Sequence, residues 1–391
     1  MSDGGSGGPG PAILQIVPAL DAGGAERSTI EIAGALTRAG FASLVASAGG
    51  RMVGELEAAG GEWIAMPANA KSPFALLANA RRLRDLIRTR NIKLVHARSR
   101  GPAWSALWAA RRTAIPFATT FHGAYSAGFP LKRFYNSIML RGDAVIANSQ
   151  WTADHIRADY SFRPKKLVVI PRGVDLERFD PAGVPRGRVM ALREAWGAGP
   201  EHTVILLPGR MTRWKGQLVL IEAMARLAKD RTGTLRVVLA GDAQGRDDYT
   251  ADVARAIARY GLGQIVAVAG HIDDMPAAYL ASDIVISAST KPEAFGRVAA
   301  EAAAMERPVI ATDHGGARET VLPGTSGLLV PPGDAGALAA ALEKLVAAGP
   351  AGRAAIGARG RAHILRHFTL ARMTGDTIAL YRELLNAALA K

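Results

Sequence analysis

Short apolar runs bounded by turn residues alternate along this chain with Ala-, Leu- and Arg-rich stretches at helical spacing. Such alternation is typical of repeated β–α units around a parallel sheet. Seven runs lie in the first half, at 12–19, 42–48, 63–66, 94–97, 117–121, 144–148 and 167–171. Six lie in the second half, at 204–208, 236–240, 265–269, 283–287, 308–312 and 327–330. The pattern therefore predicts an α/β protein of two doubly wound, Rossmann-like domains of similar size.

The segment 178–199, rich in Pro, Gly and charge, separates the two sets, and we interpret it as a linker with a short helix. We place an N-terminal domain at 12–180 and a second domain at 181–368. The Gly/Pro/Ser-rich residues 1–11 should form a disordered tail. From Thr369 an apolar stripe near 3.6 periodicity predicts a final helix over 369–391, with Thr369 as its cap.

Composition excludes several classes of function. The 391 residues include no cysteine, so disulfides, thiolate catalysis and thiolate metal sites are ruled out, as fits a reducing cytosol. No apolar run reaches about 18 residues, and residues 1–11 lack the order of a signal peptide. We therefore expect a cytoplasmic protein.

Positive charge is concentrated in one stretch of a chain whose net charge is +14. Between 81 and 133 there are twelve Lys and Arg against a single Asp. A solvated basic face and an anionic membrane surface both explain it, and we rank the membrane, the inner face of the cytoplasmic membrane, slightly higher. Nucleic acid is disfavoured because aromatics make up only 6% and no nucleic-acid motif occurs.

The most informative motif is 291–301, which follows the predicted strand 283–287. Glu293 and Glu301 stand on either side of Phe295 and Gly296, and the Ala-rich stretch 296–304 should be a helix, with Glu301 two turns into it. Its N-terminus at Gly296 would attract an anion. An anion flanked by two groups that bond hydroxyls suits a sugar joined to a nucleoside through a diphosphate.

A second motif, 209–216, follows the first strand of the second domain and carries Arg210 and Lys215. A guanidinium and an ammonium leaving the sheet edge together suit a diphosphate and the charge that develops on it as it departs. An exposed basic loop is the plain alternative, and the two glutamates of the same domain argue against it.

Strand ends in the first domain carry weaker signals. Gly23 and Gly24 would let the backbone approach a ligand, although they match neither a dinucleotide fingerprint nor a Walker loop. His122 ends the strand 117–121, where structural and functional roles are about equally plausible. His96 and Arg98, after the strand 94–97, could meet an acidic acceptor or belong to the solvated basic face.

With these residues in order, the chain resembles the family-4 retaining glycosyltransferases of GT-B architecture. Arg210 with Lys215, followed by Glu293 with Glu301 in the same domain, is the specific part of the match. The weaker motifs that accompany it are Gly23-Gly24, His122-Gly123, 171–175, Gly241-Asp242, Gly315-Gly316 and 327–330.

The resemblance implies roles for the second domain. Glu293 would bond hydroxyls of the donor sugar, the amides of Phe295 and Gly296 would line the site, and Glu301 would hold the ribose. No metal or cofactor is implied, because the nucleotide-diphosphate sugar is a substrate.

It also implies that Arg210 and Lys215 hold the donor diphosphate, that Gly24 approaches its phosphates from the first domain, and that His122 lies beside the transferred sugar. The final helix would cross back onto the first domain. Arg172 departs from the family, where Asn is frequent, which leaves its effect on the acceptor side open.

The resemblance is strongest to bacterial transferases that build lipopolysaccharide core or related envelope glycans, with mannose one candidate sugar and a membrane-associated glycan or glycolipid as acceptor. Two alternatives remain open at this point. A nucleotide-sugar 2-epimerase shares the architecture but needs acid/base carboxylates in the first domain. A non-catalytic subunit of an envelope-glycan complex would not need the Lys215 and Glu293 set. The oligomeric state cannot be predicted from the sequence.

Overall fold

The computed structural model describes residues 10–21, 23–70, 72–123, 125, 130–227, 234–245 and 247–390. The chain divides into two compact units. Unit 1 comprises residues 1–172 and 371–391, and unit 2 comprises 173–370. The prediction of two α/β domains, each built on a parallel sheet, is confirmed. The division falls between Arg172 and Gly173, earlier in the chain than the expected boundary at 180/181.

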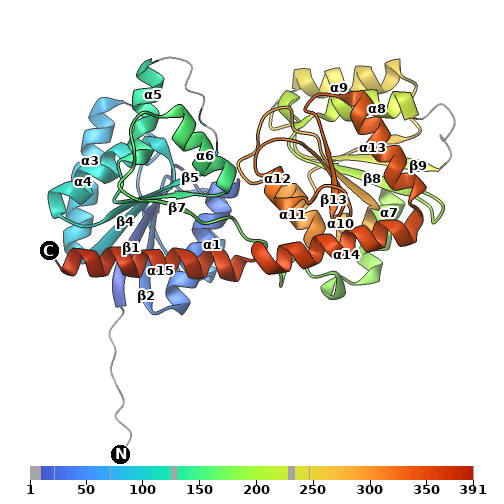
Figure 1. The fold of residues 1–391 in the computed structure, drawn as a ribbon. Helices are drawn as coiled ribbons and strands as arrows, with labels where there is room; N and C mark the ends of the chain where they lie inside the picture. The colour runs from blue at the N-terminus through green and yellow to red at the C-terminus, as the bar shows by residue number, and fades with distance from the viewer. Residues whose placement is uncertain are drawn as a thin grey trace, which may run out of the picture. The chain divides into compact units, whose positions relative to one another are not determined.

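Unit 1 is built on a seven-stranded parallel sheet of order β3-β2-β1-β4-β5-β6-β7 (Figure 1). Its strands are β1 (Gly10–Ile16), β2 (Phe41–Ser47), β3 (Glu62–Ala65), β4 (Ile92–Ala97), β5 (Phe117–Phe121), β6 (Ala144–Ala147) and β7 (Leu167–Val169). Its helices are α1 (Gly24–Arg38), α2 (Val53–Ala58), α3 (Pro73–Thr89), α4 (Arg100–Thr113), α5 (Pro130–Asn136), α6 (Gln150–Asp159) and α15 (Leu370–Leu389), with a 3-10 turn η1 (Ser137–Leu140).

Unit 2 is built on a six-stranded parallel sheet of order β10-β9-β8-β11-β12-β13. Its strands are β8 (Thr203–Pro208), β9 (Leu235–Ala240), β10 (Val266–Gly270), β11 (Ile284–Ser287), β12 (Val309–Thr312) and β13 (Gly327–Val330). Its helices are α7 (Arg186–Ala195), α8 (Gln217–Leu227), α9 (Asp247–Arg259), α10 (Met275–Ala281), α11 (Arg297–Ala304), α12 (Ala317–Thr320), α13 (Ala335–Ala347) and α14 (Gly349–His367), with 3-10 turns η2 (Pro181–Gly183) and η3 (Arg213–Lys215).

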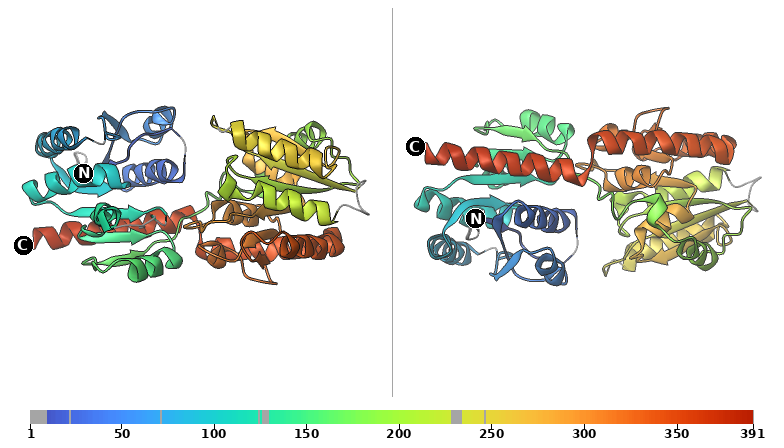
Figure 2. Two further views of the ribbon diagram at one scale, coloured as in Figure 1. Left: turned by 90° about the horizontal axis from the view of Figure 1, so that it is seen from above. Right: turned by 90° about the horizontal axis from the view of Figure 1, so that it is seen from below.

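The strands are short apolar runs because both faces of each sheet are covered by helices, as Figure 2 shows within each unit. In unit 2, β8 and β11 are buried almost completely, and helices α8 and α13 pack together over the sheet. Each sheet has one point where the strand order reverses, between β1 and β4 in unit 1 and between β8 and β11 in unit 2. Ligands of such sheets bind outside the carboxyl ends of the strands at this point.

Two expectations about the chain's irregular segments need correction. Gly10 and Pro11 belong to β1 rather than to a disordered tail, while residues 1–9 lie outside the described residues. The segment 178–199 does contain the expected short helix, α7, but it is part of unit 2 rather than a linker between domains.

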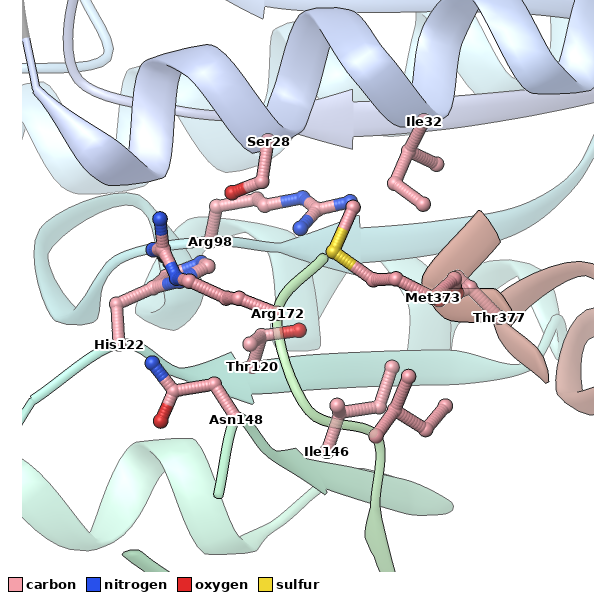
Figure 3. Close-up of a pocket in the computed structure, with 11 residues that line it drawn as sticks. Ser28, Ile32, Arg98, Thr120, His122, Ile146, Asn148, Arg172, Met373 and Thr377 are labelled. Carbon is pink, nitrogen blue, oxygen red and sulfur yellow. Dashed lines mark hydrogen bonds between the residues drawn. The ribbon is translucent and has the colours of Figure 1, made fainter. Parts of the chain in front are cut away.

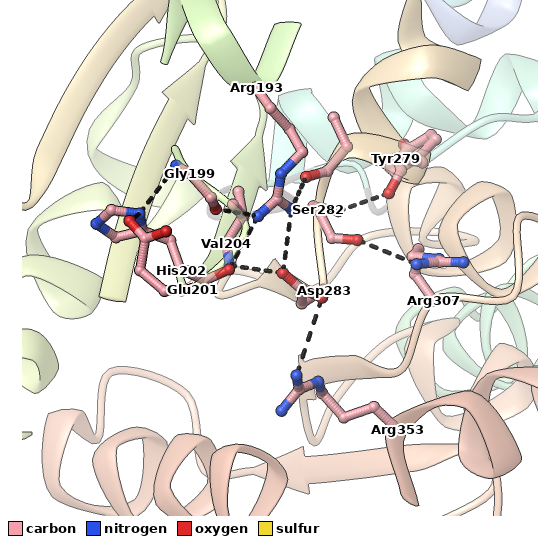
Figure 4. A network of polar contacts seen from close by, with 11 residues as sticks. Arg193, Gly199, Glu201, His202, Val204, Tyr279, Ser282, Asp283, Arg307 and Arg353 are labelled. Atoms are coloured by element: carbon pink, nitrogen blue, oxygen red, sulfur yellow. Dashed lines mark hydrogen bonds and ion pairs between the residues drawn. The ribbon is translucent and has the colours of Figure 1, made fainter. Parts of the chain in front are cut away.

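The Arg193 side chain anchors that segment (Figure 4). Its guanidinium donates to the carbonyl oxygens of Gly199 and His202 at 2.9 Å and of Ala281 at 3.0 Å, and lies 3.4 Å from the Asp283 carboxylate. Because Asp283 also accepts the Val204 backbone N–H at 2.8 Å, the segment is tied to the sheet of unit 2.

The final helix α15 packs on unit 1, as expected from the resemblance. Its buried stripe includes Tyr381, whose hydroxyl bonds the buried His96 ring, while Lys166 pairs with Glu383 at the surface. Among the described residues, no helix is long and apolar enough to cross a membrane.

Candidate functional site

The loops that follow β8 and β11 pack tightly on one another in unit 2. A Cβ atom on Gly216 would lie 2.0 Å from the Ala288 carbonyl oxygen, so only glycine fits there. Gly216 also has a φ of 81°, a left-handed conformation that ends the turn η3. The Thr290 backbone N–H donates to the Trp214 carbonyl oxygen at 2.7 Å. The two motifs 209–216 and 291–301 are thus brought together at the point where the strand order reverses.

Lys215 and Glu293 form an ion pair in this place. The Lys215 ammonium lies 2.7 Å from a Glu293 carboxylate oxygen, and the side chains are 14% and 16% exposed. The Ser289 hydroxyl donates to the same carboxylate, and the ammonium lies 4.4 Å from the centre of the Trp214 ring. A mostly buried ion pair that keeps some contact with solvent can exchange its partners for those of a charged, hydroxylated ligand.

Glu301 lies just over one turn into α11, not two, because the helix begins at Arg297. One carboxylate oxygen accepts bonds of 2.6 and 3.0 Å from Arg297, and the other accepts the Tyr279 hydroxyl at 3.1 Å. Burial, and next the adjacent Glu301 carboxylate, raise the pKa of Tyr279 well above its usual value, so its hydroxyl remains a donor. Glu301 is therefore held in one orientation.

The start of α11 is shaped by glycines. Gly296 caps the helix with a φ of 83°, and the Phe295 ring is buried, 5.6 Å from the Phe368 ring. A Cβ on Gly315 would lie 2.3 Å from the Glu293 carbonyl oxygen, so the loop after β12 presses on this turn and fixes it. The first N–H groups of α11 are then available to an anion.

Arg210 follows β8 in the same loop but differs from Lys215 in being exposed. The Arg210 carbonyl oxygen accepts a hydrogen bond of 3.0 Å from the Gln217 side-chain nitrogen. The Met211 N–H donates to the Asp242 carbonyl oxygen at 3.0 Å. The backbone of the loop is therefore fixed, while the Arg210 guanidinium can turn toward a ligand.

The predicted residues Gly24 and His122 lie in unit 1, and Arg172 joins them. The Arg172 guanidinium donates to the Gly24 carbonyl oxygen and lies 2.8 Å from the His122 Nδ1 atom. A Cβ on Gly24 would lie 2.5 Å from an Arg172 nitrogen, so the space beside this glycine is occupied by the guanidinium. Arg172 thus contacts both predicted residues of unit 1.

Beside these residues, unit 1 contains a buried polar network around Arg98 and His96 that the sequence did not predict. The Arg98 guanidinium donates to the Gln15 side-chain oxygen at 2.6 and 2.9 Å, and His96 contacts Thr120 and Tyr381. His96 is fully buried and Arg98 is 4% exposed, so neither belongs to the solvated basic face that was one interpretation of this segment.

Burial and positive neighbours control the titration of unit 1. Burial lowers the pKa of His96 well below its usual value, and Arg98 lowers it further. Burial, followed by Arg172 and Arg98, has the same effect on the pKa of His122. Both imidazoles are accordingly neutral near pH 7.

These groups line a cavity of unit 1 (Figure 3). The lining comes from α1, from the ends of β4, β5, β6 and β7, and from α15. Over the described part of the chain, no group of three or more His, Cys, Asp or Glu could hold a metal ion. The lining residues are Ser28, Ile32, Arg98, Thr120, His122, Ile146, Asn148, Ile170, Arg172, Met373 and Thr377.

Two family models match the chain. Glycosyltransferase Family 4 matches residues 22–178, and Glycosyl transferases group 1 matches residues 202–348. The crystal structure of a glycosyltransferase from Rickettsia africae is 38% identical, covers 96% of this chain and 98% of its own, and has a TM-score of 0.89.

A structure of Anabaena Alr3699/HepE in complex with UDP and glucose is 27% identical, covers 95% of this chain and 99% of its own, and has a TM-score of 0.82. The D-inositol 3-phosphate glycosyltransferase of Segniliparus rotundus is 32% identical over 239 residues, which cover 58% of this chain and 52% of that protein. The chain thus spans about half the length of the curated relatives it matches.

Proposed function

Because this chain belongs to glycosyltransferase family 4, we propose that it transfers a hexosyl unit from a nucleotide-diphosphate sugar to an acceptor, with retention of anomeric configuration. The observation that carries this proposal is the Lys215–Glu293 pair beside the N-terminus of α11, at the point where the strand order of unit 2 reverses. There a cation, free helix N–H groups and hydroxyl-binding carboxylates converge.

Donor binding would exchange the partners of that pair. The diphosphate takes the Lys215 ammonium and the α11 N–H groups, and the sugar hydroxyls take the Glu293 carboxylate. Glu301, held by Arg297 and Tyr279, accepts hydroxyls of the ribose. A carboxylate has about four acceptor sites, so Glu301 keeps these partners while it binds the ribose.

Chemistry then proceeds on one face of the sugar. The bond between the anomeric carbon and the diphosphate oxygen breaks, and the departing diphosphate accepts the proton of the acceptor hydroxyl as the new glycosidic bond forms. Lys215 and Arg210 stabilise the charge that develops on the diphosphate, which lowers the barrier. The family resemblance gives His122 a place beside the transferred sugar, and because its imidazole is neutral near pH 7 it could act there as a hydrogen-bonding group.

The acceptor in this proposal is a glycan or glycolipid of the cell envelope, reached at an anionic inner-membrane surface. Support comes from helices α3 and α5 of unit 1. Phe74 is 87% exposed, Leu131 76% and Phe134 58%, and basic residues lie on the same helices. Helix α4 links the two, because Trp104 contacts the Phe134 ring and Ser105 bonds the Leu76 carbonyl oxygen of α3. Exposed apolar groups flanked by cations suit an anionic leaflet.

A thermal-shift screen of GDP-, UDP-, ADP- and CMP-sugars tests the donor assignment. The correct donor at 100 times its dissociation constant stabilises the protein by about 2.7 kcal/mol. Lys215→Ala and Glu293→Ala should lose both this stabilisation and transfer while remaining folded. Conversion of the donor to its epimer without any acceptor would instead establish an epimerase, and unchanged activity in both variants would remove the site assignment.

Vesicle flotation tests the acceptor side. Binding to anionic vesicles should fall with added salt and should weaken when Arg81, Arg82, Arg84 and Arg88 become Ser. Binding that ignores salt would contradict the membrane part of the proposal without affecting the donor site.

A further inference from the structure

The cavity of unit 1 is unusual in its charge. Two of its lining side chains, Arg98 and Arg172, are guanidinium groups that are 4% and 8% exposed. None of the lining residues is an Asp or a Glu. A buried guanidinium is normally paired with a carboxylate, since the charge is costly to remove from water.

Arg98 is buried, and its guanidinium donates two hydrogen bonds to the single neutral side-chain oxygen of Gln15 and also bonds the neutral Tyr381 hydroxyl. Gln15 is itself fixed, because its side-chain nitrogen donates to the Thr29 carbonyl oxygen at 3.0 Å. Burial lowers the pKa of Arg98, while electrostatic interactions with Tyr381 and Glu31 act in the opposite direction. The guanidinium is thus placed and oriented by neutral groups, and its charge is only partly offset.

Two further polar atoms of the cavity have no hydrogen-bond partner within the described part of the chain. They are the Nε2 atom of His122 and the side-chain nitrogen of Asn148. Asn148 is 2% exposed, and its oxygen is occupied by the Thr152 hydroxyl at 2.9 Å, so its amide nitrogen is fixed as a donor. Figure 3 shows Asn148 and Thr120 on the side of the cavity opposite Ser28 of α1. Buried donors without acceptors call for an explanation, and a bound ligand is one.

We propose that unit 1 binds a compact oxyanion, a phosphate monoester or a carboxylate, in the cavity formed by Arg98, Arg172, Asn148, Thr120 and His122. The cavity opens to solvent, so the molecule that carries the oxyanion can extend outward from it. This inference rests on the proposed glycosyl transfer, in which the bound anion belongs to the acceptor. The acceptor is then an acidic glycan or a phosphorylated molecule rather than a neutral one.

Arg172 gives this site its specificity. It reaches from the end of unit 1's last strand to the first turn of α1 and bonds the Gly24 carbonyl oxygen, so its guanidinium is positioned before any ligand arrives. A planar guanidinium can contact two oxygens of a phosphate or carboxylate at once, which Asn at this position cannot do. Arg172 is therefore the residue that would select an anionic acceptor.

Titration calorimetry of the full chain with inorganic phosphate tests the proposal. We expect saturable binding of one phosphate to unit 1, weakened at least tenfold by Arg172→Asn and by Asn148→Asp. The second variant keeps the bond from Thr152 and adds a repelling carboxylate. Arg111→Gln, an exposed cation of the same unit, is the matched control and should bind as the wild type does. Arg98→Gln is a poorer test because Arg98 is buried in the core of unit 1.

Phosphate also suits the diphosphate site of unit 2, and Lys215→Met separates the two sites. Phosphate binding at the unit 1 cavity, which Arg172→Asn should weaken, should persist in the Lys215→Met protein. Glucose 6-phosphate should compete for it and glucose should not, if the anion belongs to a sugar acceptor; competition by phosphate alone would assign the site to the free ion. No saturable binding outside the Lys215 site, or binding unchanged in both unit 1 variants, would overturn the proposal. Donor binding measured on the same proteins keeps this outcome distinct from failure of the proposed transfer.

Discussion

The two units use the same sheet architecture but treat charge in opposite ways. In unit 2 the two functional carboxylates each have an opposite charge beside them, Glu293 with Lys215 and Glu301 with Arg297. In unit 1 the buried Arg98 is held by the neutral Gln15, and the neighbouring histidines are kept neutral. A balanced site can bind a ligand that brings both a diphosphate and hydroxyls, by exchange of partners. A positive site is completed by a ligand that brings the missing negative charge.

The largest expected effect comes from disturbing the balance in unit 2. Lys215→Met should lower kcat/KM for transfer by a factor on the order of 10²–10³, because one preorganised group that stabilises developing charge is worth about 3–4 kcal/mol. Steady-state transfer kinetics measure this. Arg213→Met is the control from the same turn: Arg213 is 71% exposed and pairs with Asp252 at the surface, so its loss should change the rate less than about threefold. Equal losses in both variants would mean that only the overall charge of the loop matters.

The pH dependence of stability should report the positive interior of unit 1. The pKa values of His96 and His122 are lowered in the folded protein, so below about pH 6.5 the unfolded chain takes up protons that the folded chain does not. Stability is complete above that pH and falls as the pH decreases, by up to about 1.4 kcal/mol per pH unit for each histidine. Urea unfolding between pH 7.5 and 5.0 measures the slope.

His122→Gln should remove one of these two contributions and flatten the curve. A slope that is the same in wild type and variant would show that His122 is protonated freely in the folded protein, and that its surroundings are not positive.

A smaller effect is expected where neutral hydrogen bonds hold unit 1 together. Tyr381→Phe leaves the Nδ1 atom of the buried His96 without its partner, which should cost about 1–3 kcal/mol of the free energy of unfolding. Glu383→Gln on the same helix disturbs only a surface pair with Lys166 and should cost less than about 1 kcal/mol. Equal costs would mean that α15 is held by its apolar stripe alone.

The two units also differ in how much of them the sequence could predict. The strands are runs of apolar residues whose pattern is local, so each of the thirteen expected runs corresponds to a strand of the structure. Lys215 and Glu293 lie in the loops that follow β8 and β11, and parallel strands end at one edge of the sheet, so their meeting could be expected. The hydrogen bond from Tyr279 to Glu301 could not be expected, because a tyrosine in a helical pattern indicates a residue of the hydrophobic core.

The unit 1 site was harder to predict for a physical reason. Gln15, Arg98, Asn148 and Arg172 come from four strand ends, and each alone is as common in a turn or on a surface as in a site. The sequence shows only how many cations the segment 81–133 contains. Burial, which depends on tertiary packing, decides which of them, such as Arg98, lie in the cavity.

Donor titrations with matched carboxylate variants test most directly the claim that unit 2 holds the donor through distinct sugar and ribose contacts. The wild type, Glu293→Gln and Glu301→Gln are each titrated with the nucleotide sugar selected by thermal shift and with the corresponding nucleoside diphosphate. Glu301→Gln should weaken both ligands about tenfold or more, since each carries the ribose, and Glu293→Gln should weaken only the nucleotide sugar. Equal weakening of the two ligands by Glu293→Gln, or no weakening by either variant, would contradict the account.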